Sequence, residues 1–258
     1  MLKIYGVPNS QPVRAVVWAC LMKSVPFEFL MTSQNLAAKQ PEYLASVNPR
    51  GTIPAIDDEG VTLWESHAIL IYLAEKHGWT DLWPTDLLAR ARVNQYLHFH
   101  HRNTRELVAV WSRTLWPALF DIKEPDEAWL RRNTFPGLKN NAEVVKNTLE
   151  IIDGMLAESK YIAGPGLSLA DICAYEELGQ NQAKYANCID YQPYPHIQCW
   201  FLEMEKLPFH EEAHTIWNLL GDLNIISGGM KTVAVANKSA AKTLQGAVDS
   251  YAGLTKPG

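Results

Sequence analysis

The 258-residue chain is 47% hydrophobic and 20% charged, with a formal net charge of -5. This composition is typical of one large or two modest domains with a well-buried core. The negative charge argues against a general nucleic-acid or anionic-membrane binder, and no apolar run approaches the roughly 20 residues that span a bilayer.

The start of the chain, MLKIYGVPNS, is too short and too polar for a signal peptide. The four cysteines lack the CxxC pairing of zinc and redox sites, so we expect reduced thiols in a cytoplasmic protein. They are Cys20, Cys173, Cys188 and Cys199. The chain contains no internal repeat, no P-loop and no dinucleotide GxGxxG motif.

The first predicted elements are a strand, a helix and a second strand. Leu2–Tyr5 predicts a short strand, and Asn9 or Ser10 can cap a helix that has Pro12 in its first turn. Pro26–Leu30 predicts the second strand. A strand-helix-strand order implies a right-handed crossover and a parallel pair.

A hairpin and a helix follow an ambiguous segment, residues 36–45, which suits a short helix. The apolar run 53–56, a turn at 57–60 and a strand at 61–64 predict the hairpin. Helical spacing then continues to His77, and Gly78 is a typical C-terminal cap. The first eighty residues therefore predict βαβ-α-ββα, a mixed sheet with helices on it.

Two features of this hairpin and helix point to chemistry. Pro54 opens a buried strand, where a cis peptide bond would explain it and would leave the backbone groups of Ile53 free to pair with an extended peptide. Glu65 and Ser66 place a carboxylate and a hydroxyl at a helix N-terminus, where backbone N–H groups bind anions. The alternative is a capped surface helix after a surface hairpin.

The apolar residues of 79–86 show neither helical nor strand spacing, which predicts a linker, whereas the spacing over residues 87–225 predicts only helices. One helix has an apolar stripe at three- and four-residue spacing and a second, polar face. The stripe is Val93, Leu97, His100, Thr104, Leu107 and Trp111; the polar face is His98, His101, Arg102 and Arg105. The histidines lack the spacing of a ligand set, so we expect no metal.

Further helices are predicted at 142–157, from 169 onward, at 197–204 and at 214–220. The helix from 169 onward begins with a capping box, in which Ser168 is the N-cap, Asp171 its reciprocal partner and Leu167 a staple residue. We expect this box to be structural and distant from chemistry.

The tail, residues 226–258, contains four lysines, Lys231, Lys238, Lys242 and Lys256. Apolar residues at 240, 244, 248 and 251 keep helical spacing, which predicts an amphipathic helix over Lys238–Ala252. A disordered tail is the alternative.

These motifs together resemble the cytosolic glutathione transferases over roughly residues 2–220. They are NPxGxIPA at 48–55, ESxAIxxYL at 65–73 and the Ser-x-x-Asp capping box. SQPVRAV at 10–16 and DLLARARV at 86–93 are similar to the theta class. The resemblance implies a homodimer, each chain with a thioredoxin-like α/β domain (1–78), a linker (79–86), an all-α domain (87–225) and an extension (226–258) that can cover the active site.

The resemblance also implies residue roles. Ser10 would activate the thiol of the co-substrate glutathione, and Arg105 would reach the active site from the helical domain. The remaining positions would bind glutathione: Gln11 and Lys39 near its glycyl end, Ile53 and Pro54 at its cysteinyl unit, and Glu65 and Ser66 at its γ-glutamyl end. The sequence departs from the theta-class pattern at two places. Arg50-Gly51-Thr52 replaces the lysine-containing sequence of some members. Arg102 stands where an acidic residue that contacts the partner subunit's glutathione can occur.

The chemistry of Ser10 fits this role independently. A cysteine thiol has a pKa of about 8.5, so only a few per cent is the nucleophilic thiolate at neutral pH. A hydroxyl at a helix N-terminus can donate a hydrogen bond to the sulfur, while the helix dipole favours the anion. The alternatives are that Ser10 only caps the helix, or that Asn9 is the donor.

We therefore expect a glutathione transferase that conjugates glutathione to halogenated or hydroperoxide-type electrophiles, with no nucleic-acid or membrane partner. Trp111 and Trp116 suit either the core or the wall of an apolar pocket for the electrophile. Alternatives are a glutathione-dependent dehalogenase, peroxidase or isomerase on the same scaffold, or a non-catalytic binding or assembly module. If the extension is a lid, we expect deletion of residues 231–258 to alter turnover and to spare the fold.

Overall fold

The computed structural model describes residues 1–108, 110 and 142–253, which form two compact units. The first unit contains Met1–Trp83, Glu205–Ile216 and the chain from Asn237 onward; the second contains Pro84–Met204 and Trp217–Ala236. Trp111 and Trp116, predicted to belong to the core or to a pocket wall, lie outside the described residues.

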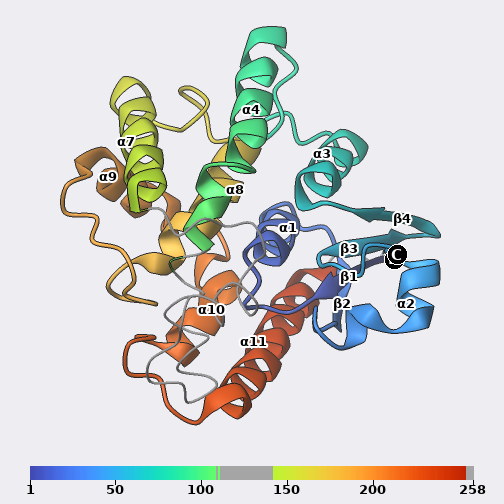
Figure 1. Ribbon diagram of the computed structural model, residues 1–258. Helices are drawn as coiled ribbons and strands as arrows, with labels where there is room; N and C mark the ends of the chain where they lie inside the picture. Colours follow the sequence, from blue (N-terminus) through green and yellow to red (C-terminus); the bar gives the residue numbers. More distant parts are fainter. Residues whose placement is uncertain (109, 111–141, 254–258) are drawn as a thin grey trace. The chain divides into compact units, whose positions relative to one another are not determined.

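A four-stranded mixed sheet forms the centre of the first unit (Figure 1). Its order is β2-β1-β3-β4, from β1 (Leu2–Gly6), β2 (Phe27–Met31), β3 (Ala55–Asp58) and β4 (Val61–Trp64). β1 and β2 are parallel and are joined by α1 (Gln11–Met22), whereas β3 is antiparallel to both of its neighbours. The predicted strand-helix-strand unit and the hairpin are confirmed.

The helices of the first 83 residues complete the predicted thioredoxin-like order. Residues 36–45 contain η1 (Ala37–Lys39) and the start of α2 (Pro41–Ser46), and α3 (Ser66–His77) follows β4. α3 ends at Gly78, whose φ of 66° is the left-handed cap that glycine adopts readily. α1 and α3 contact each other and the sheet, and Figure 1 shows them on the same face of it.

The hairpin turn is shorter than predicted. Asp57 and Asp58 belong to β3, and only Glu59 and Gly60 form the turn, with φ values of 55° and 93°. Two successive residues with positive φ are what a two-residue hairpin turn requires. The Asp57 carboxylate accepts the N–H of Gly60 at 2.8 Å, so this aspartate supports the turn from within the strand.

Chain segments distant in sequence complete the first unit. They come from α10 (His210–Leu220) and α11 (Gly229–Ala252), which contain the helices predicted at 214–220 and 238–252. Trp18 of α1 is fully buried and donates its indole N–H to the Pro208 carbonyl at 2.9 Å. The rings of His210 and His214 pack edge-on against the same indole.

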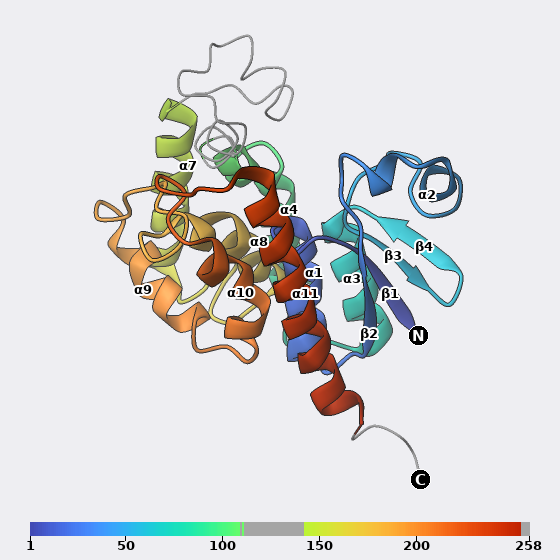
Figure 2. The ribbon, with the colours of Figure 1, turned by 90° about the horizontal axis from the view of Figure 1, so that it is seen from below.

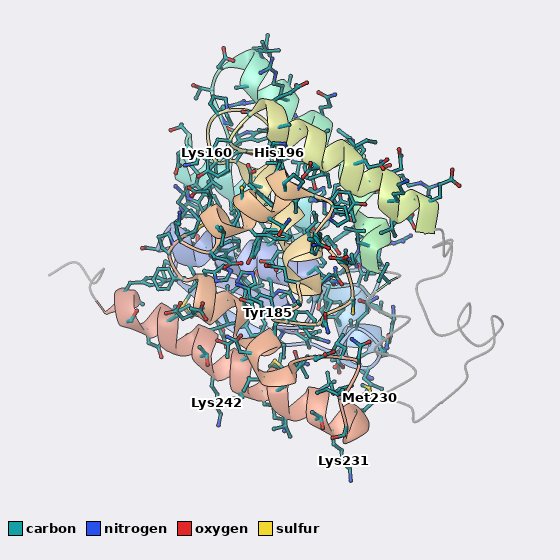
Figure 3. All side chains as sticks on the ribbon, turned by 90° about the vertical axis from the view of Figure 1, so that its left-hand side faces the viewer. Lys160, Tyr185, His196, Met230, Lys231 and Lys242 are labelled. Atoms are coloured by element: carbon teal, nitrogen blue, oxygen red, sulfur yellow. The ribbon has the colours of Figure 1, made fainter. Side chains whose placement is uncertain are left out.

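Residues 237–252 of α11 run beside β2, the edge strand of the sheet (Figure 2). The Phe29 N–H donates to Gln245 Oε1 at 3.4 Å, and the Tyr251 hydroxyl donates to the Val25 carbonyl at 3.1 Å. The side chains of Leu244 and Val248 are buried. Lys242 points away from the ribbon (Figure 3), so the helix is amphipathic as predicted and covers an edge that would otherwise expose unpaired backbone groups.

Helices are the main elements of the second unit in its described residues, as predicted, and one isolated bridge pairs Tyr161 with Gly164. Its elements are α4 (Leu87–His100), η2 (Thr104–Leu107), α7 (Ala142–Glu158), α8 (Leu169–Leu178), η3 (Gly179–Asn181) and α9 (Pro195–Met204), together with the end of α10 and the start of α11. Asp86 caps α4 by accepting the Ala89 N–H at 2.8 Å. In the described segments of the chain, no helix is long and apolar enough to cross a membrane.

The helix predicted to continue past residue 100 ends at His100. Asn103 donates its side-chain amide to the Phe99 carbonyl at 2.9 Å and has φ of -131°, outside the helical region. Such a local bond offers the backbone an alternative to the helix. Thr104 and Leu107 are nevertheless fully buried, because the 3₁₀ turn keeps the apolar stripe facing the core.

The predicted capping box at the start of α8 is confirmed. One Asp171 carboxylate oxygen accepts the Ser168 N–H and hydroxyl at 3.0 and 2.9 Å. The other accepts the Ile162 N–H at 2.9 Å and the Trp200 indole N–H at 3.1 Å. Burial raises the pKa of Asp171 to about 6 although these hydrogen bonds oppose the rise. The box therefore joins three segments of the second unit.

Candidate active site

Three loops of the first unit meet at one end of the sheet. Across the strands Tyr5 pairs with Ala55, and Ala55 pairs with Trp64. The loop after β1, the residues before β3 and the residues after β4 therefore leave the sheet side by side. The register therefore brings Ile53, Pro54, Glu65 and Ser66 to one end of the sheet, and Ser10 stands in the loop that leaves the same end after β1.

The NPRG segment builds the approach to Ile53. The Gly51 N–H donates to the Asn48 carbonyl at 2.9 Å, which closes a turn with proline at its second position, where its fixed φ is favoured. Gly51 has φ of 62°, and an added Cβ would lie 2.8 Å from the Ala38 carbonyl, so glycine is required here. The buried Asn48 amide donates to the Thr52 carbonyl at 2.9 Å, which fixes the backbone immediately before Ile53.

The Ile53–Pro54 peptide bond is cis, as predicted from the sequence. Ile53 precedes β3, and its side chain is buried. Among the described residues, neither its backbone N–H nor its C=O has a hydrogen-bond partner. Both groups can therefore pair with an extended peptide at this end of the sheet.

Glu65 and Ser66 lie where α3 begins, as predicted. Glu65 is the exposed N-cap residue, and its φ of 73° is unusual for a residue other than glycine. Its carbonyl accepts the Ile69 N–H at 2.9 Å, so the helix starts directly after the turn. Ser66 is half-buried in the first helical turn, where unpaired backbone N–H groups favour an anion.

Ser10 occupies the N-cap position of α1, with extended backbone at φ -85° and ψ 121°. Its hydroxyl makes no capping hydrogen bond to the helix, and the residue is half-buried rather than enclosed. The Ser10 hydroxyl is therefore not used to cap the helix, which was the alternative role for this residue.

Local and distant bonds hold the loop that carries Ser10. The Ser10 N–H donates to the Val7 carbonyl at 3.1 Å, and the fully buried Arg14 donates from Nη1 to the Pro8 carbonyl at 3.1 Å. The Asn9 N–H donates to Asn237 Oδ1 of α11 at 3.0 Å. This loop is thus fixed at several successive backbone groups.

Lys39 and Gln11, both predicted near the glycyl end of glutathione, differ in exposure. Lys39 is exposed and donates from Nζ to the Gly51 carbonyl at 2.6 Å, beside the turn that leads to Ile53. An ammonium group has three donors, so this bond leaves Lys39 able to bind a carboxylate. Gln11 is 4% exposed, and its amide nitrogen is buried without a partner among the described residues.

Arg105 belongs to the second unit, in η2. Its guanidinium forms an ion pair with Glu177, whose side chain is 2% exposed, while Arg105 itself is 25% exposed. His100 Nε2 lies 3.8 Å from the same carboxylate oxygen. A buried carboxylate needs a cationic partner, so Glu177 also fixes the position of the arginine.

Three residues of the site were not predicted to act there: Arg14, Asn48 and Asn237. Asn48 stands at the start of a Pro-x-Gly turn, a local signal from which its role could have been inferred. Arg14 and Asn237 carry no such signal. Their partners become apparent only when the loop is folded against α1 and α11.

The buried cysteines of the chain are unsuited to act as catalytic nucleophiles. All four cysteines are free, and Cys20 and Cys173 are buried. Burial raises the pKa of both buried thiols, so they stay protonated and unreactive at neutral pH. Among the described residues, no group of three histidine, cysteine, aspartate or glutamate side chains could hold a metal ion.

Sequence comparison gives two family matches. Residues 4–81 match the family described as "Glutathione S-transferase, N-terminal domain", and residues 121–208 match "Glutathione S-transferase, C-terminal domain". Glutathione S-transferase theta-1 of Mus musculus is 32% identical over 222 residues, 84% of this chain and 88% of the mouse protein. Glutathione S-transferase theta-2 of Rattus norvegicus is 33% identical over 231 residues, 85% of this chain and 88% of the rat protein.

Solved structures agree with the sequence matches. Human glutathione-S-transferase T1-1 in its apo form superimposes with a TM-score of 0.73 at 26% identity, and the match covers 95% of this chain and 100% of the human chain. Glutathione Transferase E6 of Drosophila melanogaster gives a TM-score of 0.66 at 28% identity, over 95% and 98% of the two chains. The chain belongs to the glutathione S-transferase family. Within that family it is theta-like, and it is a glutathione transferase enzyme.

Proposed function

We propose that this enzyme activates the thiol of glutathione with the hydroxyl of Ser10. One observation carries the proposal: the hydroxyl stands at the N-terminus of α1 and is not used as a helix cap. A donor at that place can bond to a sulfur anion, and the helix dipole favours the same charge. A charge-assisted hydrogen bond is worth about 1.5–3 kcal/mol, equal to a lowering of the thiol pKa by about one to two.

Glutathione would be held along the end of the sheet. The free backbone groups of Ile53, next to cis Pro54, would pair with the cysteinyl unit. Glu65 and Ser66 would bind the amine and carboxylate of the γ-glutamyl group, since a side-chain carboxylate attracts the amine and a helix N-terminus attracts the carboxylate. We place the glycyl carboxylate near Lys39. Gln11 is assigned to the same end, with its buried amide supporting the wall of the site.

We assign the other catalytic role to Arg105, whose guanidinium would stabilise negative charge in the reacting groups. Its ion pair with Glu177 keeps the side chain ordered while a quarter of it remains exposed. The electrophile would be a halogenated or hydroperoxide-type compound bound mainly by the helical domain. The working enzyme would be a cytoplasmic homodimer, as the family resemblance implies.

The test measures the thiolate ultraviolet absorbance of the enzyme–glutathione complex against pH. Ser10→Ala is expected to raise the pKa of the bound thiol by about one to two, with little change in affinity because the other anchors remain. Turnover at neutral pH should fall by a comparable factor and recover in part at high pH, where the thiol ionises unaided. Retention on immobilised glutathione and turnover with several electrophiles define the substrate class.

Asn9→Ala is the matched control, since Asn9 is the neighbouring side chain and the competing donor. A titration in which Asn9→Ala shifts and Ser10→Ala overlays the wild type would assign the role to Asn9. If neither variant shifts, Arg105 or the helix terminus carries the activation, which an Arg105→Ala titration then separates.

A further inference from the structure

The C-terminal helix bonds to the loop that carries Ser10. Side chains of α11 bond to backbone groups among the first 83 residues: Asn237 to Asn9, Gln245 to Phe29 and Tyr251 to Val25. The last two anchor the helix along β2, away from the loop. Asn237 is 5% exposed, and its bond to the Asn9 N–H joins residues 228 positions apart.

The bond from Asn237 falls on a peptide group that is held at its other end as well. The Pro8 carbonyl and the Asn9 N–H belong to one peptide unit, which is planar and rigid. Arg14 Nη1 donates to the oxygen of that unit at 3.1 Å, and Asn237 Oδ1 accepts from its N–H at 3.0 Å. Because this peptide plane is held at both its carbonyl oxygen and its amide hydrogen, it cannot rotate about the line that joins its two Cα atoms.

Ser10 begins one residue after this plane. Its position depends on the orientation of the Pro8–Asn9 peptide and on the two backbone angles of Asn9. The Ser10 N–H bond to Val7 closes the turn locally but does not fix that plane. Since a displacement of about 1 Å at a reacting group can cost about a hundredfold in rate, the orientation of the plane bears directly on the hydroxyl.

We propose that Asn237 is a positioning residue for thiol activation, acting through the Pro8–Asn9 peptide to keep the Ser10 hydroxyl aimed at the sulfur of glutathione. The inference rests on the proposed role of Ser10. It gives α11 a part in the chemistry of glutathione itself, separate from any part in covering the electrophile.

The experiment compares Asn237→Ala and Asn237→Leu with Tyr251→Phe in the full-length enzyme. Alanine and leucine favour helix more than asparagine does, so α11 should form in both variants. Each is expected to raise the pKa of the bound glutathione thiol by about half a unit or more, equal to about a threefold loss of thiolate at neutral pH. The fall should appear in kcat, with the dissociation constant of glutathione changed less than about twofold. Tyr251→Phe removes a different α11 anchor and should titrate like the wild type.

A double variant separates positioning from general loosening. If Asn237 acts through the hydroxyl, Ser10→Ala with Asn237→Ala should titrate like Ser10→Ala alone, because residues in one chain of effect are not additive. Additive shifts, or a Tyr251→Phe shift as large as that of Asn237→Ala, would overturn the inference. The inference about Asn237 would also be overturned if both Asn237 variants titrated like the wild type while Ser10→Ala was shifted. The proposed role of Ser10 would stand in that case. A Ser10→Ala titration identical to the wild type would overturn both proposals together.

Discussion

Ser66 is the proposed anchor of the γ-glutamyl carboxylate of glutathione. It lies in the first turn of α3, at the end of the sheet where the loops meet. Ser66→Ala should weaken glutathione binding by about 1–3 kcal/mol, because the substitution removes a hydrogen-bond partner from a charged group. Calorimetry on the purified variant measures this change. Ser239→Ala, at an exposed position of α11, is the matched control, and an unchanged dissociation constant for Ser66→Ala would exclude the residue from the site.

At this scale the sequence predicts residues whose partners are close in the chain. The cis bond before Pro54, the start of α3 at Ser66 and the cap at Gly78 follow from local chemistry and are confirmed. The two groups that hold the Pro8–Asn9 peptide were not predicted. Asn237 lies in a helix whose sequence pattern reports only which face is apolar, so a single polar contact on the buried side has no signature.

Among the elements, α8 depends on Asp171 more than a capping box alone requires. Loss of a cap costs about 0.5–2 kcal/mol, but this carboxylate also accepts hydrogen bonds from Ile162 and Trp200. Asp171→Ala should therefore lower the free energy of unfolding by more than about 3 kcal/mol, since several buried donors lose their acceptor. Denaturant unfolding measures the loss, with Ser168→Ala as the milder control. A large fall in activity per folded molecule at full stability would contradict a structural role.

Element boundaries were predicted less well than the elements. The apolar stripe over 93–107 is buried as predicted, but α4 stops at His100 because the Asn103 side chain competes for the Phe99 carbonyl. The predicted hairpin turn starts two residues too early, because the aspartates of Asp57-Asp58-Glu59-Gly60 are typical turn residues, yet both lie in β3. Periodicity reports which face is buried; it does not report where a side chain replaces a backbone bond.

For the whole molecule, α11 alters what a truncation should do. The sequence suggested that residues 231–258 could be deleted with the fold intact. Residues 237–252, however, are part of the first unit and bury Leu244, Val248 and Tyr251 in it. A chain that ends at Ala236 should lose roughly 4–9 kcal/mol of stability, at about 1.5–3 kcal/mol for each of these three large side chains. Thermal unfolding, with a chain that ends at Gly253 as control, checks this, and equal melting temperatures would refute it.

The class of fold and the family followed from the order of elements and a few motifs, because these depend on short-range signals. The set of chain segments that make up the first unit could not be predicted in this way. Nothing local indicates that residues 205–216 and 237–252 pack with the first 83 rather than with the helices next to them in sequence.

This discontinuity has a consequence for how the enzyme is made. A ribosome that has synthesised only the sheet, α1 and α3 has produced every residue assigned to bind glutathione, but the edge strand β2 is still uncovered. The unit can close only after more than 150 further residues have emerged, and contacts of such long sequence separation form slowly. We therefore expect the nascent glutathione-binding domain to remain dependent on chaperones until α11 docks, so that competence for catalysis arrives last, together with the final helix.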